Sequence, residues 1–171
     1  MLSSNNIISI IIPVYCNEES LKELYKFIND EVIIKNENIQ FEIIFVDDGS
    51  NDNSFKILQD IYCENRPKVK VIKFSRNFGQ AAAWSAGLNY CSGNYAVIIS
   101  ADLQDPPELI NTMIEIVHNN NSDIVIANRE GRDESLFRVI TSKIFYSIMR
   151  LLSFKNMPLG GFDFFLISRR V

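Results

Sequence analysis

Histidine, cysteine and long hydrophobic runs are scarce in this chain, and each scarcity excludes a class of protein. Among the 171 residues there is one histidine, His118, so neither a histidine-based catalytic triad nor a zinc cluster is expected. The three cysteines, Cys16, Cys63 and Cys91, are odd in number and lack paired metal-ligand spacing. They favour a reducing, cytosolic setting over a disulfide framework.

A membrane span, a secretion signal and a basic surface are also missing from the sequence. No run approaches the roughly 18 to 20 apolar residues of a spanning helix. Ile7–Val14 is the nearest, and without a basic leader it does not have the pattern of a signal peptide. The net charge of −4, from 17 basic and 21 acidic residues, argues against a generic nucleic-acid-binding protein. Neither G-x-G-x-x-G nor G-K-[ST] occurs, so dinucleotide and P-loop sites are not expected.

The hydrophobic pattern that is present predicts an α/β fold. Hydrophobic residues make up 47% of the chain, and its length fits one globular domain. Ile- and Val-rich runs at residues 7–12, 41–46, 69–74, 95–100 and 124–127 are mostly continuous, as in strands covered on both faces. Helical stripes lie between them, within residues 21–32, 55–62 and 109–117. This alternation predicts a mostly parallel, doubly wound sheet with flanking helices.

The charge is unevenly distributed along the chain. Residues 1–132 carry a balance of −7, whereas residues 133–171 carry +3. The second segment interleaves aromatic and aliphatic residues, such as Phe137 and Phe145, with Arg138, Lys143 and Arg150. Two interpretations remain open: a core-packing helix with solvated basic residues, or a basic amphipathic helix on an anionic membrane surface.

Polar residues follow each predicted strand. In parallel sheets the carboxyl ends of the strands meet at one edge, where ligands bind. The segments that follow the strands are residues 13–19, 47–52, 75–80, 101–105 and 128–132, and they are rich in acids, amides and arginines. We therefore expect a polar site at this edge.

Most parts of this site have a structural alternative. Asp47–Ser50 is typical of a turn with a helix cap, or of carboxylates that accept hydrogen bonds from a base or ribose. The small residues between Gly79 and Gly87 permit either tight helix packing or close approach of a ligand to the backbone. Arg76, Arg129 and Arg132 are candidates for phosphate contacts or solvated surface residues.

The segment Asp102-Leu-Gln104-Asp105 is the strongest local signal. It offers two carboxylates and an amide oxygen at a strand end, and hard divalent cations prefer such oxygen ligands. The structural alternative is that Asp105 caps a helix starting at Pro106-Pro107. Both roles are compatible if Asp102 binds the metal and Asp105 forms the cap.

Taken together, these motifs resemble the family 2 glycosyltransferases of the GT-A fold. The matching stretches cover nearly the whole chain in the family's order: Pro13-Val-Tyr15-x-Asn17-Glu18-Glu19, Val46-Asp47-Asp48-Gly49-Ser50-x-Asp52, Asn77-Phe-Gly79-Gln80, Ala101-Asp102-Leu-Gln104-Asp105-Pro106-Pro107-Glu108, Arg129 with Arg132, and Gly161-Phe-Asp163-Phe. The stretch from Ala101 to Glu108 most resembles the polyprenyl-phosphate branch, that is, dolichyl-phosphate mannose synthases and bactoprenol glucosyltransferases. Two departures stand out: Ser100 replaces the first acid of the usual D-x-D, and Cys16 precedes Asn17-Glu18 where tyrosine is more usual.

The resemblance implies roles for individual residues. Those implied to bind a UDP- or GDP-sugar are Pro13, Val14, Tyr15, Asn17, Glu18, Val46, Asp48, Asn77, Gly79, Gln80, Asp102, Arg129 and Arg132. Asp102 and Gln104 are implied to bind Mg²⁺ or Mn²⁺ on the diphosphate. Asp163 matches the catalytic base of inverting relatives. The implied activity is inverting, metal-dependent transfer of a sugar to a polyprenyl phosphate or glycan in cell-envelope polysaccharide or lipid-linked sugar synthesis.

The resemblance also implies a domain organisation and a location. We expect one catalytic domain over residues 1–171, truncated at its C-terminus, on the cytoplasmic side with peripheral contact at the inner face of the plasma membrane. Residues 1–132 would form the nucleotide-sugar and metal half, and residues 133–171 the start of the acceptor- or membrane-facing half. The alternatives are a sugar nucleotidyltransferase and a truncated, non-catalytic nucleotide-binding module. The former would favour a glycine-rich basic loop after the first strand, which this sequence lacks.

Overall fold

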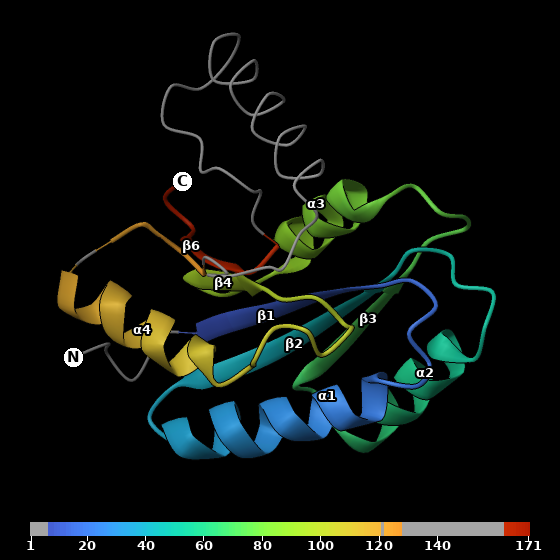
Figure 1. Ribbon diagram of the computed structural model, residues 1–171, viewed down its shortest axis with the longest axis horizontal. Helices are drawn as coiled ribbons and strands as arrows, with labels where there is room; N and C mark the ends of the chain where they lie inside the picture. The colour runs from blue at the N-terminus through green and yellow to red at the C-terminus, as the bar shows by residue number, and fades with distance from the viewer. Residues whose placement is uncertain (1–6, 121, 128–162) are drawn as a thin grey trace, which may run out of the picture.

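A computed structural model describes residues 7–120, 122–127 and 163–171 of the chain (Figure 1). Six strands and four α-helices follow one another in the order β1 (Ile7–Val14), α1 (Leu21–Ile28), β2 (Gln40–Asp47), α2 (Ser54–Glu64), β3 (Val69–Lys73), α3 (Gln80–Tyr90), β4 (Tyr95–Ile98), α4 (Leu109–Asn120), β5 (Ile124–Ile126) and β6 (Phe165–Ser168). Helix α1 continues through a π-helical turn, Asn29–Ile33, and a 3-10 turn, Ile34–Asn36. All five strands expected from the hydrophobic pattern are present.

The strands form one mixed sheet in the order β3-β2-β1-β4-β6-β5. Strand β1 pairs in parallel with β2 and β4, and β2 pairs in parallel with β3. Strand β6 is antiparallel to both of its neighbours, β4 and β5. The sheet is therefore mostly parallel, as the sequence predicted, and β5 still runs in the direction of β1 to β4.

Helices cover both faces of the sheet, which explains why the strands read as continuous hydrophobic runs. Helices α1, α2 and α4 lie on one face and α3 on the other (Figure 1). Alternate residues of β1 serve the two layers: Ile10 and Ile12 pack toward α1, α2 and α4, whereas Ile11 packs toward α3. Each of these side chains is fully buried. Burial on this scale contributes roughly 1.5 to 3 kcal/mol per side chain.

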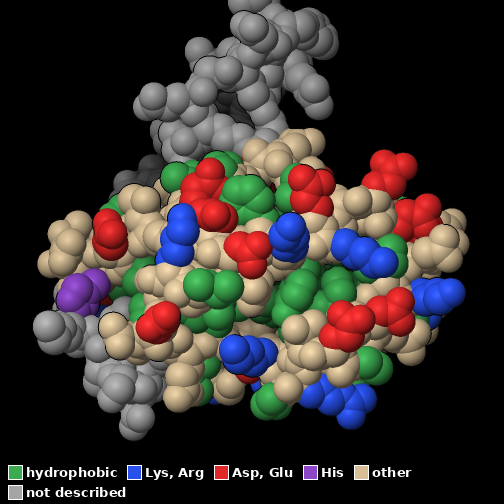
Figure 2. All heavy atoms as spheres, turned by 90° about the horizontal axis from the view of Figure 1, so that it is seen from below, with side chains coloured by type: hydrophobic (Ala, Val, Ile, Leu, Met, Phe, Trp, Pro, Cys, Tyr) green, Lys and Arg blue, Asp and Glu red, His purple; other side chains and the backbone are tan. Residues whose placement is uncertain are grey.

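On the face seen in Figure 2, acidic and basic side chains are interspersed with hydrophobic ones. Within residues 7–120, 122–127 and 163–171, no helix has both the length and the hydrophobicity to cross a bilayer. For the basic segment, the sequence left open a core-packing helix or a helix on a membrane surface. This segment falls largely on residues 133–162, outside the described ranges.

Hydrogen bonds join the loops at the carboxyl edge of the sheet. The Asp48 N–H donates to the Val14 carbonyl and the Phe74 N–H to the Asp47 carbonyl, both at 2.8 Å. The Ser20 hydroxyl donates to the Ala101 carbonyl at 2.6 Å. The loops after β1, β2, β3 and β4 therefore hold one another in place.

Candidate functional site

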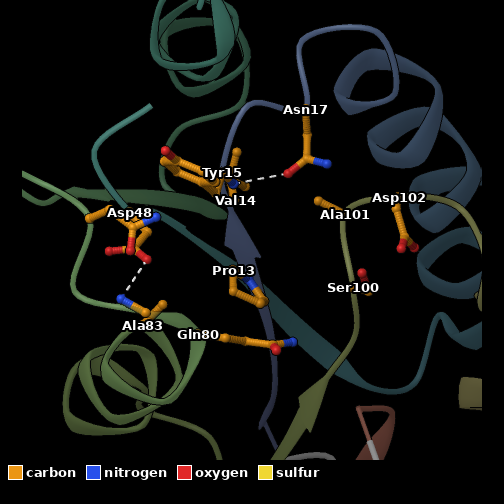
Figure 3. Close-up of a pocket in the computed structure, with 12 residues that line it drawn as sticks. Pro13, Val14, Tyr15, Asn17, Asp48, Gln80, Ala83, Ser100, Ala101 and Asp102 are labelled. Atoms are coloured by element: carbon orange, nitrogen blue, oxygen red, sulfur yellow. Dashed lines mark hydrogen bonds between the residues drawn. The ribbon is translucent and has the colours of Figure 1, made fainter. Parts of the chain in front are cut away.

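A cavity of about 270 Å³ opens where the loops at the carboxyl edge meet the start of α3 (Figure 3). Its lining comes from four segments far apart in the sequence: Pro13, Val14, Tyr15 and Asn17 after β1, Asp48 after β2, Asn77, Gly79, Gln80 and Ala83 around the start of α3, and Ser100, Ala101 and Asp102 after β4. The structure thus brings together most of the residues that the sequence assigned to a nucleotide-sugar site. Asp48 and Asp102 lie on opposite sides of the cavity (Figure 3).

The wall after β1 is held in a fixed turn. The Tyr15 N–H donates to Asn17 Oδ1 and the Asn17 N–H to Ser54 Oγ, each at 2.9 Å. Between them Cys16 has a φ of +54° and donates its N–H to Ser50 Oγ. Because the backbone is fixed here, the Tyr15 side chain, 49% exposed, is available to a ligand as a flat aromatic surface.

A second wall is built around Asp48. This carboxylate is only 3% exposed and accepts the Phe78 N–H at 2.7 Å and the Gly79 N–H at 2.9 Å. The second bond is drawn in Figure 3. Each carboxylate oxygen is therefore engaged by the loop between β3 and α3.

Asp102 is an exposed carboxylate at the cavity rim. Its Oδ1 accepts the Gln104 N–H at 3.0 Å across a turn in which Leu103 has a φ of +59°. Gln104 itself is exposed and does not belong to the cavity lining. Helix α4 begins at Leu109, whose N–H donates to the Pro106 carbonyl, and Asp105 is buried directly before this turn.

The residues around Asp102 fit a divalent cation shared with a substrate. Within the ranges that the structure describes, no group of three His, Cys, Asp or Glu side chains comes together to hold a metal. The donors here are one carboxylate, the Gln104 amide and the Ser100 hydroxyl. Mg²⁺ typically takes one or two carboxylates and completes its shell with substrate phosphates and water, which matches this donor set.

Two residues assigned to the donor site by resemblance do not reach the cavity. Glu18 accepts the Asn53 N–H at 2.8 Å and donates its own N–H to Asp52, so it joins the loops after β1 and β2. Val46 is fully buried in the apolar layer beneath α3. Asp52 also accepts the Ser54 N–H. Burial acts to raise the pKa of Asp52, but its hydrogen bonds outweigh this effect and lower the pKa. The backbone N–H groups at the start of α2 are thus accepted by the Glu18 and Asp52 carboxylates.

Asp163 lies at the same edge of the sheet. It is exposed and directly precedes Phe164 and β6. Strand β6 pairs Phe165 with Ile98, so continuing this antiparallel register brings Asp163 level with Ser100. The two predicted phosphate-binding arginines, Arg129 and Arg132, lie outside the described residues.

Three lining residues had not been assigned to the site from the sequence. Ser100 and Ala101 occupy the first two positions of the Ser-Ala-Asp stretch, where the family's D-x-D begins, so that motif was the available signal. Ala83 lies one helical turn after Gln80, and its place on α3 follows from helical periodicity.

The sequence from residue 9 to 171 matches the model of the family described as Glycosyl transferase family 2. The chain is a family 2 glycosyltransferase. This membership confirms the resemblance drawn from the motifs and decides against the sugar nucleotidyltransferase alternative.

Curated relatives agree with this assignment. The glycosyltransferase domain is 38% identical, over 95% of this chain, to the uncharacterised glycosyltransferase YkcC of Bacillus subtilis. It is 39% identical, over 80% of the chain, to an undecaprenyl-phosphate 4-deoxy-4-formamido-L-arabinose transferase of Pseudomonas fluorescens. The chain spans about half the length of the first relative, 50%, and 39% of the second.

Solved structures show the same fold. The mannosyltransferase PcManGT of Pyrobaculum calidifontis, solved with GDP-Man and Mn²⁺, superimposes with a TM-score of 0.66 at 18% identity, over 95% of this chain and 44% of that one. Together with its mixed six-stranded sheet, this likeness gives the family 2 glycosyltransferase the GT-A fold that the sequence predicted.

Proposed function

We propose that this chain is the donor-binding part of an inverting, metal-dependent glycosyltransferase that uses a UDP- or GDP-sugar. The carrying observation is the cavity at the carboxyl edge, with Tyr15 and Asp48 on one side and Asp102 on the other. A volume of about 270 Å³ is close to the lower end of ordinary ligand pockets. The GDP-Man and Mn²⁺ held by the structural relative support a nucleotide-sugar ligand.

Different cavity residues are assigned to different parts of the nucleotide-sugar donor. Tyr15 offers an aromatic surface to the base, and Pro13 and Asn17 border the same wall. Asp102 and Gln104 would hold Mg²⁺ or Mn²⁺, with Ser100 beside them. When bound, the cation would neutralise the negative charge that develops on the departing nucleoside diphosphate. Arg129 and Arg132 remain proposed phosphate ligands.

Asp163 is the proposed catalytic base. Its register level with Ser100 brings a carboxylate to the edge that carries Asp102. In an inverting displacement the acceptor oxygen attacks the anomeric carbon from the face opposite the leaving group, so one base suffices. A sugar hydroxyl would pass its proton to the Asp163 carboxylate, whereas a phosphate acceptor is already ionised and Asp163 would then orient it.

The proposed acceptor is a polyprenyl phosphate or a glycan of cell-envelope synthesis. The undecaprenyl-phosphate relative supports the lipid acceptor, as does the net positive charge of residues 133–171. A lipid acceptor would require peripheral contact at the inner face of the plasma membrane, where cationic residues are attracted to anionic lipids.

Thermal unfolding with nucleotides tests the donor site. UDP, GDP and their sugars are added with and without Mn²⁺, and stabilisation by one base series is expected only with the metal. A ligand at 100 times its Kd adds about 2.7 kcal/mol, or about 5 to 10 °C for a chain of this size. Asp102→Ala should lose this shift, and Asp60→Ala, an exposed acid of α2, should keep it. If no nucleotide stabilises the protein, the proposal is wrong; binding without transfer would identify a non-catalytic module.

A further inference from the structure

Two residues at the cavity have a backbone conformation that side chains disfavour. Among the described residues other than glycine, only Cys16 and Leu103 have positive φ angles, of +54° and +59°. Cys16 lies between Tyr15 and Asn17, which both line the cavity. Leu103 directly follows Asp102, which also lines it. Such angles persist only where the surrounding structure enforces them, and they cluster at ligand sites. The unfavourable angles of this protein are thus concentrated at the cavity.

Leucine is poorly suited to the angle that Leu103 adopts. In the left-handed region the Cβ atom comes close to a carbonyl oxygen, which reduces the population of this conformation by a factor of about 5 to 30. Glycine has no Cβ atom and adopts the same angle freely. An interaction of the leucine side chain must therefore offset the backbone cost.

The hydrophobic core supplies this interaction. The Leu103 side chain packs against the core on the sheet face covered by α1, α2 and α4. The residues on either side of it, Asp102 and Gln104, are exposed. These three residues lie between two buried ones, Ala101 and Asp105. Leu103 is accordingly the residue of the turn whose side chain is directed into the protein.

The turn around Leu103 joins the two residues that would hold the cation. Asp102 Oδ1 accepts the Gln104 N–H at 3.0 Å, so a hydrogen bond spans the leucine. A carboxylate and an amide are thereby fixed on either side of one residue that is anchored in the core. Ligands that are fixed before binding lose less conformational freedom when a metal-bound diphosphate arrives.

We propose that Leu103 is a positioning residue, whose side chain in the core holds the left-handed turn that arranges Asp102 and Gln104 for a metal-bound diphosphate. This inference rests on the proposed function, because it assigns a role within the same donor site. Without the anchor the turn would relax. The affinity for a nucleotide with Mn²⁺ would then fall in proportion to the fraction of molecules that keep the turn.

Three substitutions separate the anchor from the backbone angle. Calorimetry with Mn²⁺ measures the Kd of UDP and GDP, and urea unfolding measures the stability of each variant. For whichever nucleotide binds the unchanged protein, Leu103→Ala should weaken binding about 5- to 30-fold, because alanine lacks the anchor and disfavours the angle. Leu103→Met keeps an apolar side chain of similar volume and should bind within about 3-fold of the unchanged protein.

Leu103→Gly is the decisive variant. It lacks the anchor but adopts the angle freely, so its Kd should lie between those of the other two variants, at least about 3-fold tighter than that of Leu103→Ala. Glycine that binds no better than alanine would overturn the proposal. If Leu103→Ala does not fold, glycine that binds as tightly as methionine would also overturn it, since the anchor would then contribute nothing.

A purely structural role of Leu103 would give a different pattern. Truncation would then lower the free energy of unfolding and leave the Kd unchanged, which would also contradict the proposal. Ile39→Ala is the matched control, because Ile39 is partly buried against the same core and lies outside the cavity lining. It should lower stability and leave the Kd unchanged. Failure of the proposed function is distinct, because the unchanged protein would then bind neither nucleotide.

Discussion

At the scale of single residues, two glycines near the cavity with positive φ angles have very different surroundings. The Cβ position of Gly49 is blocked by the backbone of Arg76 and Asn77, whereas that of Gly79 has no atom within 4 Å. An alanine at either position would experience the unfavourable backbone angle, and at Gly49 it would also push a loop away.

We expect Gly49→Ala to lower the free energy of unfolding by roughly 3 kcal/mol, combining about 1 to 2 kcal/mol of left-handed backbone cost with displacement of the 76–77 backbone. Gly79→Ala has no neighbour to displace, but φ of +94° and ψ of 158° lie in a region open essentially only to glycine, so backbone strain alone should cost about 1 to 3 kcal/mol. Urea unfolding measures both. A loss of less than about 2 kcal/mol for Gly49→Ala would mean that the contact with Arg76 contributes nothing.

The adjacent carboxylates Asp47 and Asp48 show how far the sequence could define the site. Strand alternation sends them to opposite faces: Asp48 faces the α3 loop, while Asp47 is fully buried and accepts the Ser50 N–H. The convergence of strand ends was predictable because parallel strands share an edge. The contacts of Glu18 and Val46 were not, since a loop partner such as Asn53 or a layer beneath α3 depends on tertiary packing.

At the scale of elements, the close contact of α3 with the sheet depends on Gly87. A Cβ there would lie 2.3 Å from Ile11 Cγ2 in the centre of β1. For the small residues between Gly79 and Gly87 the sequence left open tight helix packing or close approach of a ligand. Gly87 serves tight packing. Gly79 and Ala83 line the cavity, where the approach of a ligand stays a prediction.

Gly87→Ala sets two effects against each other. Alanine is favoured over glycine inside a helix by about 1 kcal/mol, whereas overpacking a core costs about 1 to 3 kcal/mol. Because Ile11 is fully buried, we expect overpacking to win and the variant to be less stable. Denaturant unfolding checks the sign. Asn89→Ala, on the exposed part of α3, should be stabilising.

A second change, which creates a cavity, tests the cause. Ile11→Ala removes the atoms that meet Gly87, so the double variant should be more stable than the sum of the two single losses implies. Simple additivity would show that Gly87 matters for a reason other than its contact with Ile11.

At the scale of the whole molecule, an ion pair between a buried carboxylate and an exposed lysine joins elements at the amino edge of the sheet. Glu42 of β2 accepts the Ser9 hydroxyl and the Ser92 N–H and pairs with Lys70 of β3 at 2.7 Å. Burial acts to raise the pKa of Glu42, but the bonds from Lys70, Ser9 and Ser92 outweigh it and lower the pKa to about 2. The Glu42 carboxylate therefore links β1, β2, β3 and the loop before β4.

This charge predicts acid sensitivity of the fold. A carboxyl whose pKa falls from 4.5 unfolded to about 2 folded stabilises the protein above pH 4.5, and the contribution disappears as pH falls toward 2. It amounts to at most about 3 kcal/mol. Urea unfolding between pH 6 and pH 2.5 should show this decline, with a shallower one in Glu42→Gln and an unchanged one in Asp60→Asn. Parallel curves for Glu42→Gln and the unchanged protein would contradict the assignment.

The order of the sheet has a consequence for how the chain is made. Strand β6 lies between β4 and β5, and within the described residues β5 pairs with β6 alone. As the chain leaves the ribosome, β5 at residues 124–126 must therefore wait for residues 165–168 before it gains a partner. Until then β4 presents an open edge, the surface on which strands of other molecules add most readily. Nascent chains stalled before residue 165 are accordingly expected to need chaperone protection, whereas those that have released β6 are not.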